Sequence, residues 1–509
     1  MFSEKDLEQI KAKGISQTKL AEQIKNFEEG FPFLELKKVA TIGDGILKFD
    51  EKEIDDYVKM YESEMSKHQI YKFVPASGAA SRMFKSLFSF MEKYDGSDEA
   101  IKDFEGDTSF GSVFTFFKNI KQFAFYGSLK SVIAESGTNI DELIYQEEYG
   151  QVLRYLLTTT GLNYGGLPKG LLEFHNYKTV TRTPLEEHLV EGANYCKDKD
   201  GKVDIHFTVS PEHKALFREK VLTAGQPLSD EYKSEFKAYF SEQQAYTDTI
   251  AVDLENHPFR NVDGSILFRP AGHGALLENL NTIDADIVFI KNIDNVVAEQ
   301  YVDEVAYYKK VLGGKLLWLQ KKIFSYLVLL DKKNTSTEKL NEMKSFLRDE
   351  LNNRESILTS VTMKKIFNRP LRVCGVVKNT GAPGGGPFWV QNGNTLPTLQ
   401  IVEMSQIDSN NQDHQAIVES ATHFNPVDLV CGLKDYKGSK FDFRNFIDHN
   451  SGFIVEKNKF GKPIKGYELP GLWNGAMANW ITIFVEVPLI TFNPVKTIND
   501  LLKPAHQNH

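Results

Sequence analysis

Small residues followed at once by basic ones form the first stretch of the chain that could bind a phosphorylated ligand. The stretch is YKFVPASGAASRMFKSL, residues 71–87. Its pattern predicts a strand over Tyr71–Val74, a tight loop over Pro75–Ser81 and a helix that begins at Arg82. Small side chains let a backbone approach a ligand closely, and Arg82 and Lys85 add the positive charge that phosphate requires. An ordinary strand–loop–helix corner packed with small residues is the alternative.

A second candidate cation lies in GGLPKG, residues 165–170, where Lys169 stands between a proline and a glycine. The backbone of this turn is rigid, so the ammonium of Lys169 can contact an anion there. The alternative is that the lysine is only solvated, as is usual in such a turn. Beyond it, Glu186, Glu187 and His188 begin a predicted helix whose polar face we expect to point outward.

The third stretch combines a glycine-flanked histidine with a strand that ends in oxygen-bearing side chains. His273 lies between Gly272 and Gly274 in a turn before a helix, and IVFIKNIDN at 287–295 reads as a buried strand followed by Asp294. Carboxylates at the carboxyl end of a parallel strand lie where α/β sheets bind ligands, and a hard oxygen donor suits Mg²⁺ shared with phosphate. The alternative for Asp294 is a cap of the next helix.

The elements around these stretches predict an α/β protein with helical insertions. Residues 1–70 read as a helical N-terminal cap, and residues 71–509 as the main domain, with helical insertions at 86–160 and 298–366. Continuous apolar runs typical of sheets covered on both faces predict the strands between them. These strands are Val203–Val209, Ile266–Phe268, Ile287–Ile290, Arg372–Val377, Leu399–Met404, Val427–Cys431 and Phe453–Val455.

Composition excludes several classes of partner. The 509 residues carry a net charge of -9, with a sequence pI near 5.8, so we expect neither a nucleic acid nor an anionic membrane as partner. The three cysteines are far apart, without the spacing of a disulfide framework or a zinc site, which fits a reducing cytoplasm. Residues 1–30 are charged and the most apolar run, 316–330, is interrupted by polar residues, so neither a signal peptide nor a membrane span is expected.

Two further loops carry aromatic residues. VKNTGAPGGGPFWVQN at 377–392 is a glycine run that ends in Phe388 and Trp389, and it favours a flexible loop that closes over a ligand, with a plain surface turn as the alternative. ELPGLWNGAMANW at 468–480 places Trp473 and Asn474 on another loop, where packing and substrate contact are both open.

Read together, these segments resemble the UDP-sugar pyrophosphorylase family, whose members join a sugar 1-phosphate to UTP. The resemblance extends to three C-terminal segments: LQIVEMSQID at 399–408, HFNPVDLVCGL at 423–433 and FNPVKTINDLL at 492–502. The chain is thereby identified as a divergent member, within a bacterial family of unknown function. The resemblance implies a GT-A-like, Rossmann-like nucleotidyltransferase fold with a mixed sheet, and a nucleoside triphosphate and a sugar phosphate as substrates. It leaves the base, the sugar and the oligomeric state open.

The resemblance also implies where the nucleotide would bind. Arg82 and Lys169 would contact the triphosphate as catalytic cations, and Asp294 would hold the cofactor Mg²⁺. The residues assigned to the nucleotide itself are Ser77, Gly78, Ala79, Gly272 and His273.

For the sugar substrate, the resemblance implies that Glu403 and Asn425 contact sugar hydroxyls and that Lys496 contacts the sugar phosphate. That phosphate is the nucleophile that attacks the α-phosphorus of the triphosphate. Because the nucleophile is already anionic, the reaction needs positioning and cations rather than a general base.

Departures from the family pattern keep two other functions open. Ser77 and Ala80 replace glycines of the family's first loop, a long helical segment separates Arg82 from Lys169, and Met404 stands where the family has tyrosine. One alternative is a glycosyltransferase that uses an NDP-sugar, against which Lys496 argues. The other is a catalytically silent protein that binds sugar nucleotides, for which the lost glycines argue.

Overall fold

The computed structural model describes residues 2–78, 80–332, 335–355, 357–381, 385–391, 393, 396–425 and 427–508. The chain divides into two compact units. Unit 1 contains residues 1–71, 241–290 and 309–488, and unit 2 contains residues 72–240, 291–308 and 489–509. Both units combine helices with strands, so the predicted α/β class is confirmed.

Unit 1 is built on a mixed sheet with the strand order β2-β3-β19-β12-β16-β11. The central strand β12 runs parallel to β19 and antiparallel to β16. The strands of unit 1 are β1 (Glu35–Val39), β2 (Thr41–Ile42), β3 (Gly45–Leu47), β9 (Thr249–Ile250), β10 (Phe268–Arg269), β11 (Ile287–Lys291), β12 (Leu371–Lys378), β13 (Gly386–Gln391), β14 (Thr398–Val402), β15 (His423–Phe424), β16 (Asp428–Gly432), β17 (Phe453–Lys459), β18 (Lys462–Glu468) and β19 (Ile481–Glu486). All of the predicted strands that fall in this unit are present, with ends shifted by a few residues.

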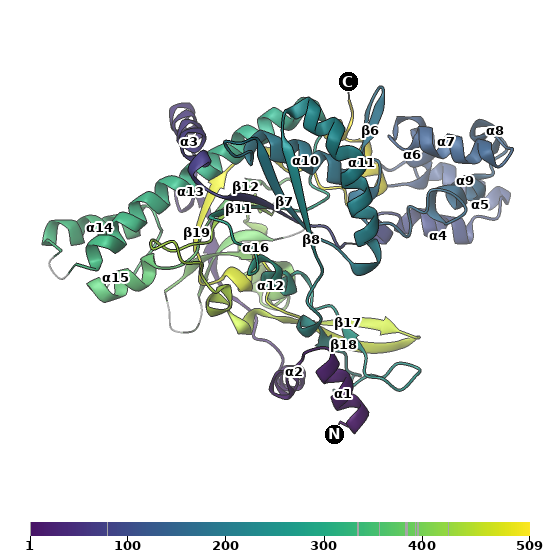
Figure 1. Ribbon diagram of the computed structural model, residues 1–509. Coiled ribbons are helices and arrows are strands. Elements are labelled where there is room, and N and C mark those ends of the chain that lie inside the picture. Colours follow the sequence, from purple (N-terminus) through teal and green to yellow (C-terminus); the bar gives the residue numbers. More distant parts are fainter. Residues whose placement is uncertain are drawn as a thin grey trace. The chain divides into compact units, whose positions relative to one another are not determined.

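The helices of unit 1 flank this sheet and its satellite hairpins. They are α1 (Glu4–Ala12), α2 (Gln17–Glu29), α3 (Glu51–Glu64), α12 (Leu276–Leu280), α14 (Thr337–Asp349), α15 (Ser360–Phe367), α16 (Gln412–Glu419) and, from Lys309 on, α13 (Val302–Leu330). Helices α1 and α2 lie beside the hairpin of β17 and β18 (Figure 1), and apolar side chains of these elements share a small core.

Unit 2 has a shorter sheet and a group of helices. The strands β4 (Ile70–Pro75), β7 (Lys202–Thr208) and β8 (Glu235–Ser241) are neighbours in that order, and β5 (His175–Tyr177) pairs antiparallel with β6 (Val180–Arg182). Its helices are α4 (Lys85–Lys93), α5 (Asp98–Gly106), α6 (Val113–Lys118), α7 (Tyr126–Glu135), α8 (Ile140–Tyr145), α9 (Tyr149–Leu157), α10 (Pro184–Tyr195) and α11 (Lys214–Tyr232). Helices α4 to α9 gather into one group (Figure 1), around a core rich in phenylalanine.

Three local predictions are corrected by the structure. The helix predicted from Arg82 begins at Lys85, because Ala80–Arg82 forms a single 3-10 turn instead. The polar face predicted to point outward from α10 is buried, since Glu187 and His188 both have 0% exposure. The burial of Glu187 is possible because polar partners come from β5: its Oε1 lies 2.9 Å from His175 Nδ1 and accepts a hydrogen bond of 2.7 Å from Tyr177 Oη.

The predicted lid of residues 377–392 is the third correction. Phe388 and Trp389 lie in strand β13 and are buried, while residues 382–384 and 392 lie outside the described residues. Trp389 finds its partners inside unit 1: its Nε1–H donates to Asp44 O at 3.2 Å, and the Arg354 guanidinium lies 4.1 Å from the indole centroid. The aromatic pair is therefore part of a core and does not form the tip of a loop.

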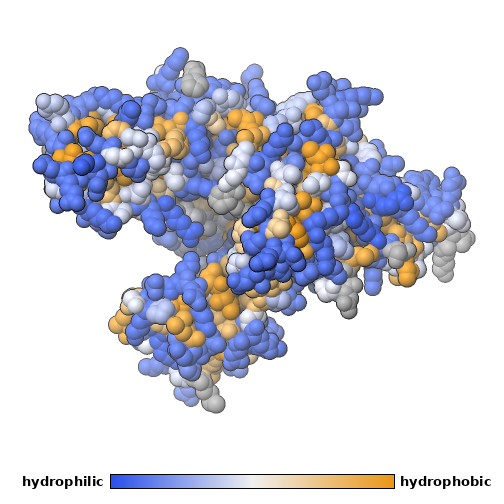
Figure 2. Space-filling model, turned by 180° about the vertical axis from the view of Figure 1, so that it is seen from behind, coloured by the Kyte–Doolittle hydropathy of each residue, from blue (hydrophilic) through white to orange (hydrophobic). Residues whose placement is uncertain are grey.

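Hydrophilic residues cover most of the face seen in Figure 2, where apolar residues gather only in small groups. Among the described residues, no helix combines the length and the apolar composition needed to cross a membrane.

Candidate active site

Four segments of unit 2 meet at the turn that follows β11. Ile293 N donates to Pro75 O at 3.3 Å, which brings the end of β4 to the turn, and Val495 N donates to Asp294 O at 3.3 Å, which brings the C-terminal segment to it. The fourth segment contains Gly170, where a side chain would collide with Phe217 and crowd Ile293. A glycine is required there because the backbone of the Pro-Lys-Gly turn packs directly on the turn after β11.

Lys169 and Asp294 form an ion pair at the centre of this site. Lys169 Nζ donates to Asp294 Oδ2 at 2.7 Å and to Val495 O at 2.6 Å. The side chains are 16% and 17% exposed, so the pair is partly accessible to a ligand. An ammonium has three N–H donors, which leaves Lys169 one for a bound anion.

Lys496 extends from the same C-terminal segment, whose backbone is held by Asp500. Asp500 Oδ2 accepts hydrogen bonds from Lys496 N at 2.8 Å and Thr497 N at 2.7 Å. Burial lowers the pKa of Lys496, and the charges of Asp294, Asp500 and Lys169 act on it as well. Lys496 is therefore close enough to the central ion pair to share its electrostatic field.

The first loop lies beside these residues. Ser77, Gly78 and Arg82 are exposed, and Arg82 makes no hydrogen bond or ion pair with another described residue. Ile498 N donates to Met83 O at 3.2 Å, which joins this loop to the C-terminal segment. One backbone amide of this loop is already occupied, because Ala80 N donates to Leu167 O at 3.3 Å. Ala79, also predicted to bind nucleotide, lies outside the described residues.

Beneath the turn, two buried lysines share one buried carboxylate. Glu191 Oε2 accepts from Lys72 Nζ at 2.8 Å and Glu191 Oε1 accepts from Lys291 Nζ at 2.6 Å. Burial alone would raise the pKa of Glu191, but the two ammonium groups hold it well below its usual range. Burial also lowers the pKa of Lys72 to about 8, against the opposing attraction of Glu191.

His188 links this buried group to the turn. Burial, together with the charge of Lys72, holds the pKa of His188 well below its ordinary value, so the ring is neutral. Its Nε2 lies 3.2 Å from both Asn292 O and Ile293 O. Because a carbonyl can only accept, Nε2 carries the proton and donates it to the turn that presents Asp294.

Unit 1 contains a second group, centred on His273. Gly272 has a φ of +74°, and a side chain there would collide with Glu468, so the turn before His273 requires glycine. Leu472 N donates to His273 Nδ1 at 3.0 Å, so Nδ1 is an acceptor and the proton of the neutral ring lies on Nε2. Nε2 lies 3.3 Å from Glu403 Oε1, to which it donates.

Aromatic and amide side chains complete the His273 group. The Trp473 ring stacks on His273, with centroids 4.1 Å apart and planes 10° from parallel. Burial works to raise the pKa of Glu403, but hydrogen bonds from His273, Trp473 and Asn474 hold it below its ordinary value. The group therefore presents an ionised carboxylate fixed by three donors. In the loop at 468–480, Trp473 and Asn474 pack within this group, and substrate contact stays a prediction.

Asn425, the other predicted sugar contact, is separate from this group. Its side chain is buried, its Nδ2 donates to Gly375 O at 2.9 Å, and its Oδ1 accepts from Val427 N at 3.0 Å. Both ends of the amide therefore hold backbone, and a sugar contact at Asn425 stays a prediction.

Sequence reasoning missed several residues that shape these groups. Asp500 had a readable signal, since Thr497 and Asp500 form a capping box, with a hydroxyl residue three positions before an acidic one. Lys72, Glu191 and Lys291 had none, because their pairing depends on contacts between β4, α10 and β11 that no local pattern encodes.

The chain was compared with protein families and known structures. Residues 3–507 match the family described as "Domain of unknown function (DUF4301)". A search of curated proteins gives no sequence match. A solved structure of UDP-N-acetylglucosamine pyrophosphorylase from Trypanosoma brucei is similar, with a TM-score of 0.50 and 13% identity over 98% of this chain and 79% of that chain. UDP-glucose pyrophosphorylase from Leishmania major matches with a TM-score of 0.45 and 12% identity over 98% of this chain and 77% of that chain. At such identities the Trypanosoma likeness establishes the fold alone, the GT-A-like nucleotidyltransferase fold.

Proposed function

The chain belongs to this family of unknown function, and we propose that it is a nucleotidylyltransferase. In the proposed reaction a nucleoside triphosphate and a sugar 1-phosphate give an NDP-sugar and pyrophosphate. The observation that carries the proposal is the convergence of Lys169, Asp294 and Lys496 from three distant segments of unit 2. Two lysines around one accessible carboxylate form a site for phosphate oxygens.

The chemistry that this group favours is displacement at phosphorus. An oxygen of the sugar phosphate forms a bond to the α-phosphorus, the bond from that phosphorus to the bridging oxygen breaks, and pyrophosphate leaves with the electron pair. No proton moves, because the nucleophile is already an anion. In this proposal Lys169 and Arg82 contact the triphosphate, and Lys496 holds the sugar phosphate in line for attack.

The residues around Asp294 fit a magnesium ion that is shared with a ligand. Mg²⁺ prefers oxygen donors and is commonly bound by one or two carboxylates together with substrate phosphates. Asp294 Oδ2 accepts from Lys169, while Oδ1 makes no hydrogen bond to another described residue. No cluster of three potential metal ligands exists among the described residues, so the ion would depend on the phosphates for its other ligands. Bound there, it would neutralise charge on the phosphate oxygens.

The His273 group of unit 1 suits a different part of the substrates. Glu403 is an ionised acceptor, and a carboxylate repels phosphate but accepts hydrogen bonds from hydroxyl groups. A contact of Glu403 with sugar hydroxyls, and contacts of His273 and Gly272 with the nucleoside, stay predictions for unit 1 taken by itself. Because the Trypanosoma neighbour is a UDP-N-acetylglucosamine pyrophosphorylase, UTP is the first nucleotide to test.

A catalytically silent sugar-nucleotide binder is the second candidate, favoured by one specific observation. Ala80 N is bonded to Leu167 O, so this amide is not available to cradle a triphosphate. Such a protein would bind NDP-sugars and form no product.

The test is synthesis by the purified full-length protein. It is incubated with Mg²⁺, one of the common nucleoside triphosphates and one of several sugar 1-phosphates, and products are separated by anion exchange. We expect an NDP-sugar and pyrophosphate in equal amounts for at least one pair. A thermal-shift screen with the same compounds identifies the pair that binds, because a ligand of the native state raises its stability. Binding without product would replace the proposal with the silent binder.

A further inference from the structure

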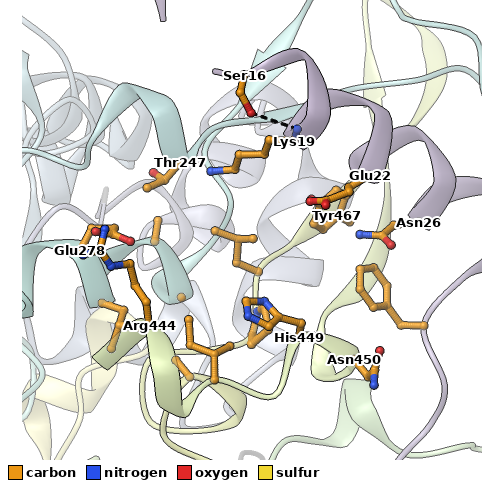
Figure 3. Close-up of a pocket in the computed structure, with 18 of the residues that line it drawn as sticks. Ser16, Lys19, Glu22, Asn26, Thr247, Glu278, Arg444, His449, Asn450 and Tyr467 are labelled. Atoms are coloured by element: carbon orange, nitrogen blue, oxygen red, sulfur yellow. Dashed lines mark hydrogen bonds between the residues drawn. The ribbon is translucent and has the colours of Figure 1, made fainter. Parts of the chain in front are cut away.

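A cavity of about 630 Å³ opens on unit 1, at a place that the proposed reaction does not use. Its walls come from α2, from the turn at 274–278, from residues 444–450 and from residues 467–476 (Figure 3). The volume falls within the range of small-molecule sites in proteins. The cavity is therefore large enough for a ligand of one or two sugar rings.

Three polar side chains at this cavity are available to a ligand. Glu22, His449 and Asn450 surround one hollow in Figure 3, and none of these side chains makes a hydrogen bond or ion pair with another described residue. Lys19 also lines the cavity, with its side chain directed towards Thr247 in Figure 3, and it uses one donor on Tyr246 O, at 2.7 Å, which leaves two. The cavity thus offers hydrogen-bond donors and acceptors together.

The charged side chains around the cavity give no excess of cations. Lys19 and Arg444 are offset by Glu22 and Glu278, and Arg444 is already bound by two hydrogen bonds to Asp442, at 2.8 and 2.9 Å. A phosphate site requires an excess of cationic donors, as at Lys169 and Lys496, and this cavity has no such excess. This balance of charges favours a neutral ligand over a phosphate.

Aromatic and apolar side chains form the rest of the wall. Phe31 and Tyr467 lie with their ring centroids 5.4 Å apart, next to Leu469 and Pro470. Such a surface buries the apolar face of a ligand, while the polar groups meet its edge. A sugar ring has this combination, since its C–H faces are apolar and each hydroxyl both donates and accepts.

We propose that this cavity is a binding site for a neutral, hydroxyl-rich small molecule of the saccharide class, distinct from the His273 group. Gly274 and Ala275 line the cavity and directly follow His273, and Pro470 and Ala476 line it on either side of Trp473. A bound saccharide would therefore contact the backbone segments that carry the stacked pair of His273 and Trp473. The site adds a second ligand to the protein and does not depend on the transfer reaction.

The experiment is a titration of the full-length protein with glucose, N-acetylglucosamine and maltose, followed by saturation-transfer NMR. Glucose 1-phosphate serves as the anionic comparison. Asn450→Trp places an indole in the cavity mouth, and Asn410→Trp is the matched control. Both asparagines are exposed, and the backbone N–H of each donates to the side chain of an aspartate two residues earlier. We expect a neutral saccharide to bind in the millimolar range or tighter, and Asn450→Trp to weaken it by about tenfold while Asn410→Trp leaves it unchanged.

A second pair of variants keeps the test decisive if Asn450→Trp disturbs folding. Glu22→Gln removes an acceptor of the cavity, and Glu28→Gln makes the same change on α2 outside it. We expect about a threefold to tenfold loss of affinity for Glu22→Gln alone. The proposal is overturned if no neutral saccharide binds, if binding ignores both cavity variants, or if glucose 1-phosphate is the ligand whose binding Asn450→Trp removes.

Discussion

Two groups in unit 2, each of two lysines and one carboxylate, lie near the turn that follows β11. They differ in how many hydrogen-bonding groups remain for a ligand. Around Asp294, Lys169 is partly exposed and keeps a donor for a ligand. Around Glu191, Lys72 and Lys291 are fully buried, and both carboxylate oxygens are already bonded. The same residue types can thus stay accessible to a ligand or bond only to one another, and burial decides between the two.

The comparison leads to opposite expectations for the two groups. Changes at Asp294 and Lys496 should alter turnover and leave stability nearly intact. Changes at Glu191 and Lys72 should alter stability and leave the chemical step nearly intact.

The largest effect is expected for Asp294→Asn. The variant removes the charge proposed to hold Mg²⁺ on the phosphates, so turnover should fall by about a thousandfold or more, while the circular dichroism spectrum and melting temperature stay close to wild type. Steady-state rates at several Mg²⁺ concentrations measure it. Normal turnover in Asp294→Asn would remove the turn from the active site.

Glu191→Gln tests the buried group and should produce the next largest effect. It leaves two buried ammonium groups without a counter-charge, so the free energy of unfolding should fall by about 3–5 kcal/mol. Urea unfolding measures the loss. An unchanged midpoint would mean that the buried group is not the structural support described above.

Lys496→Ala should raise the Michaelis constant for the sugar phosphate and slow the chemical step, with triphosphate binding nearly unchanged. The expected loss is about 2–4 kcal/mol of transition-state stabilisation, the scale for one preorganised charged donor. Lys496→Arg should rescue poorly, because the guanidinium is planar and wider than an ammonium. Kinetics with each substrate varied in turn decide the matter, with the exposed Lys130→Ala as control; wild-type constants would leave Lys496 without a role in the reaction.

Lys72→Met should have the smallest effect at neutral pH. Glu191 keeps Lys291 as its partner, so the unfolding free energy should change by no more than about 1 kcal/mol, and turnover should stay near wild type. A large loss of turnover with normal stability would mean that the buried group takes part in the chemistry and is more than a structural support.

The pH dependence of the same variant sharpens this result. The pKa of Lys72 is about 8 in the folded protein and 10.5 in the reference state, so the unfolded chain binds more protons between these values. The contribution of Lys72 to stability is therefore present above pH 10.5 and is lost as the pH falls through 8. Between pH 8 and 10.5, the free energy of unfolding of wild type should therefore rise relative to that of Lys72→Met, by up to about 3 kcal/mol.

Much of the fold was readable from local patterns. Continuous apolar runs predicted β11 and β12, and the polar residues that follow the first of these runs predicted that Asp294 would lie just after the end of β11. These features can be read locally, because hydrophobic periodicity and the residue preferences of turns act within a few residues.

The predictions that failed concern residues whose positions depend on contacts between distant segments. Trp389 looked like part of a lid because glycines precede it, yet pairing of β13 with β1 and β14 buries it. The polar face of α10 looked solvated because no local pattern shows that His188 lies against the backbone of Asn292 and Ile293, more than a hundred residues further along the chain. The position of Lys496 beside Asp294 likewise depends on hydrogen bonds across about two hundred residues, which no single-sequence pattern encodes.

Pyrophosphate exchange is the sharpest test of nucleotidyl transfer by this protein, because it requires the chemical step and does not depend on the order in which the forward substrates bind. The purified protein is incubated with Mg²⁺, labelled pyrophosphate and an NDP-sugar, beginning with UDP-glucose and UDP-N-acetylglucosamine. We expect labelled nucleoside triphosphate with wild type and none with Asp294→Asn. If the wild-type protein binds an NDP-sugar but forms no labelled triphosphate from any NDP-sugar that it binds, the protein is not a nucleotidylyltransferase.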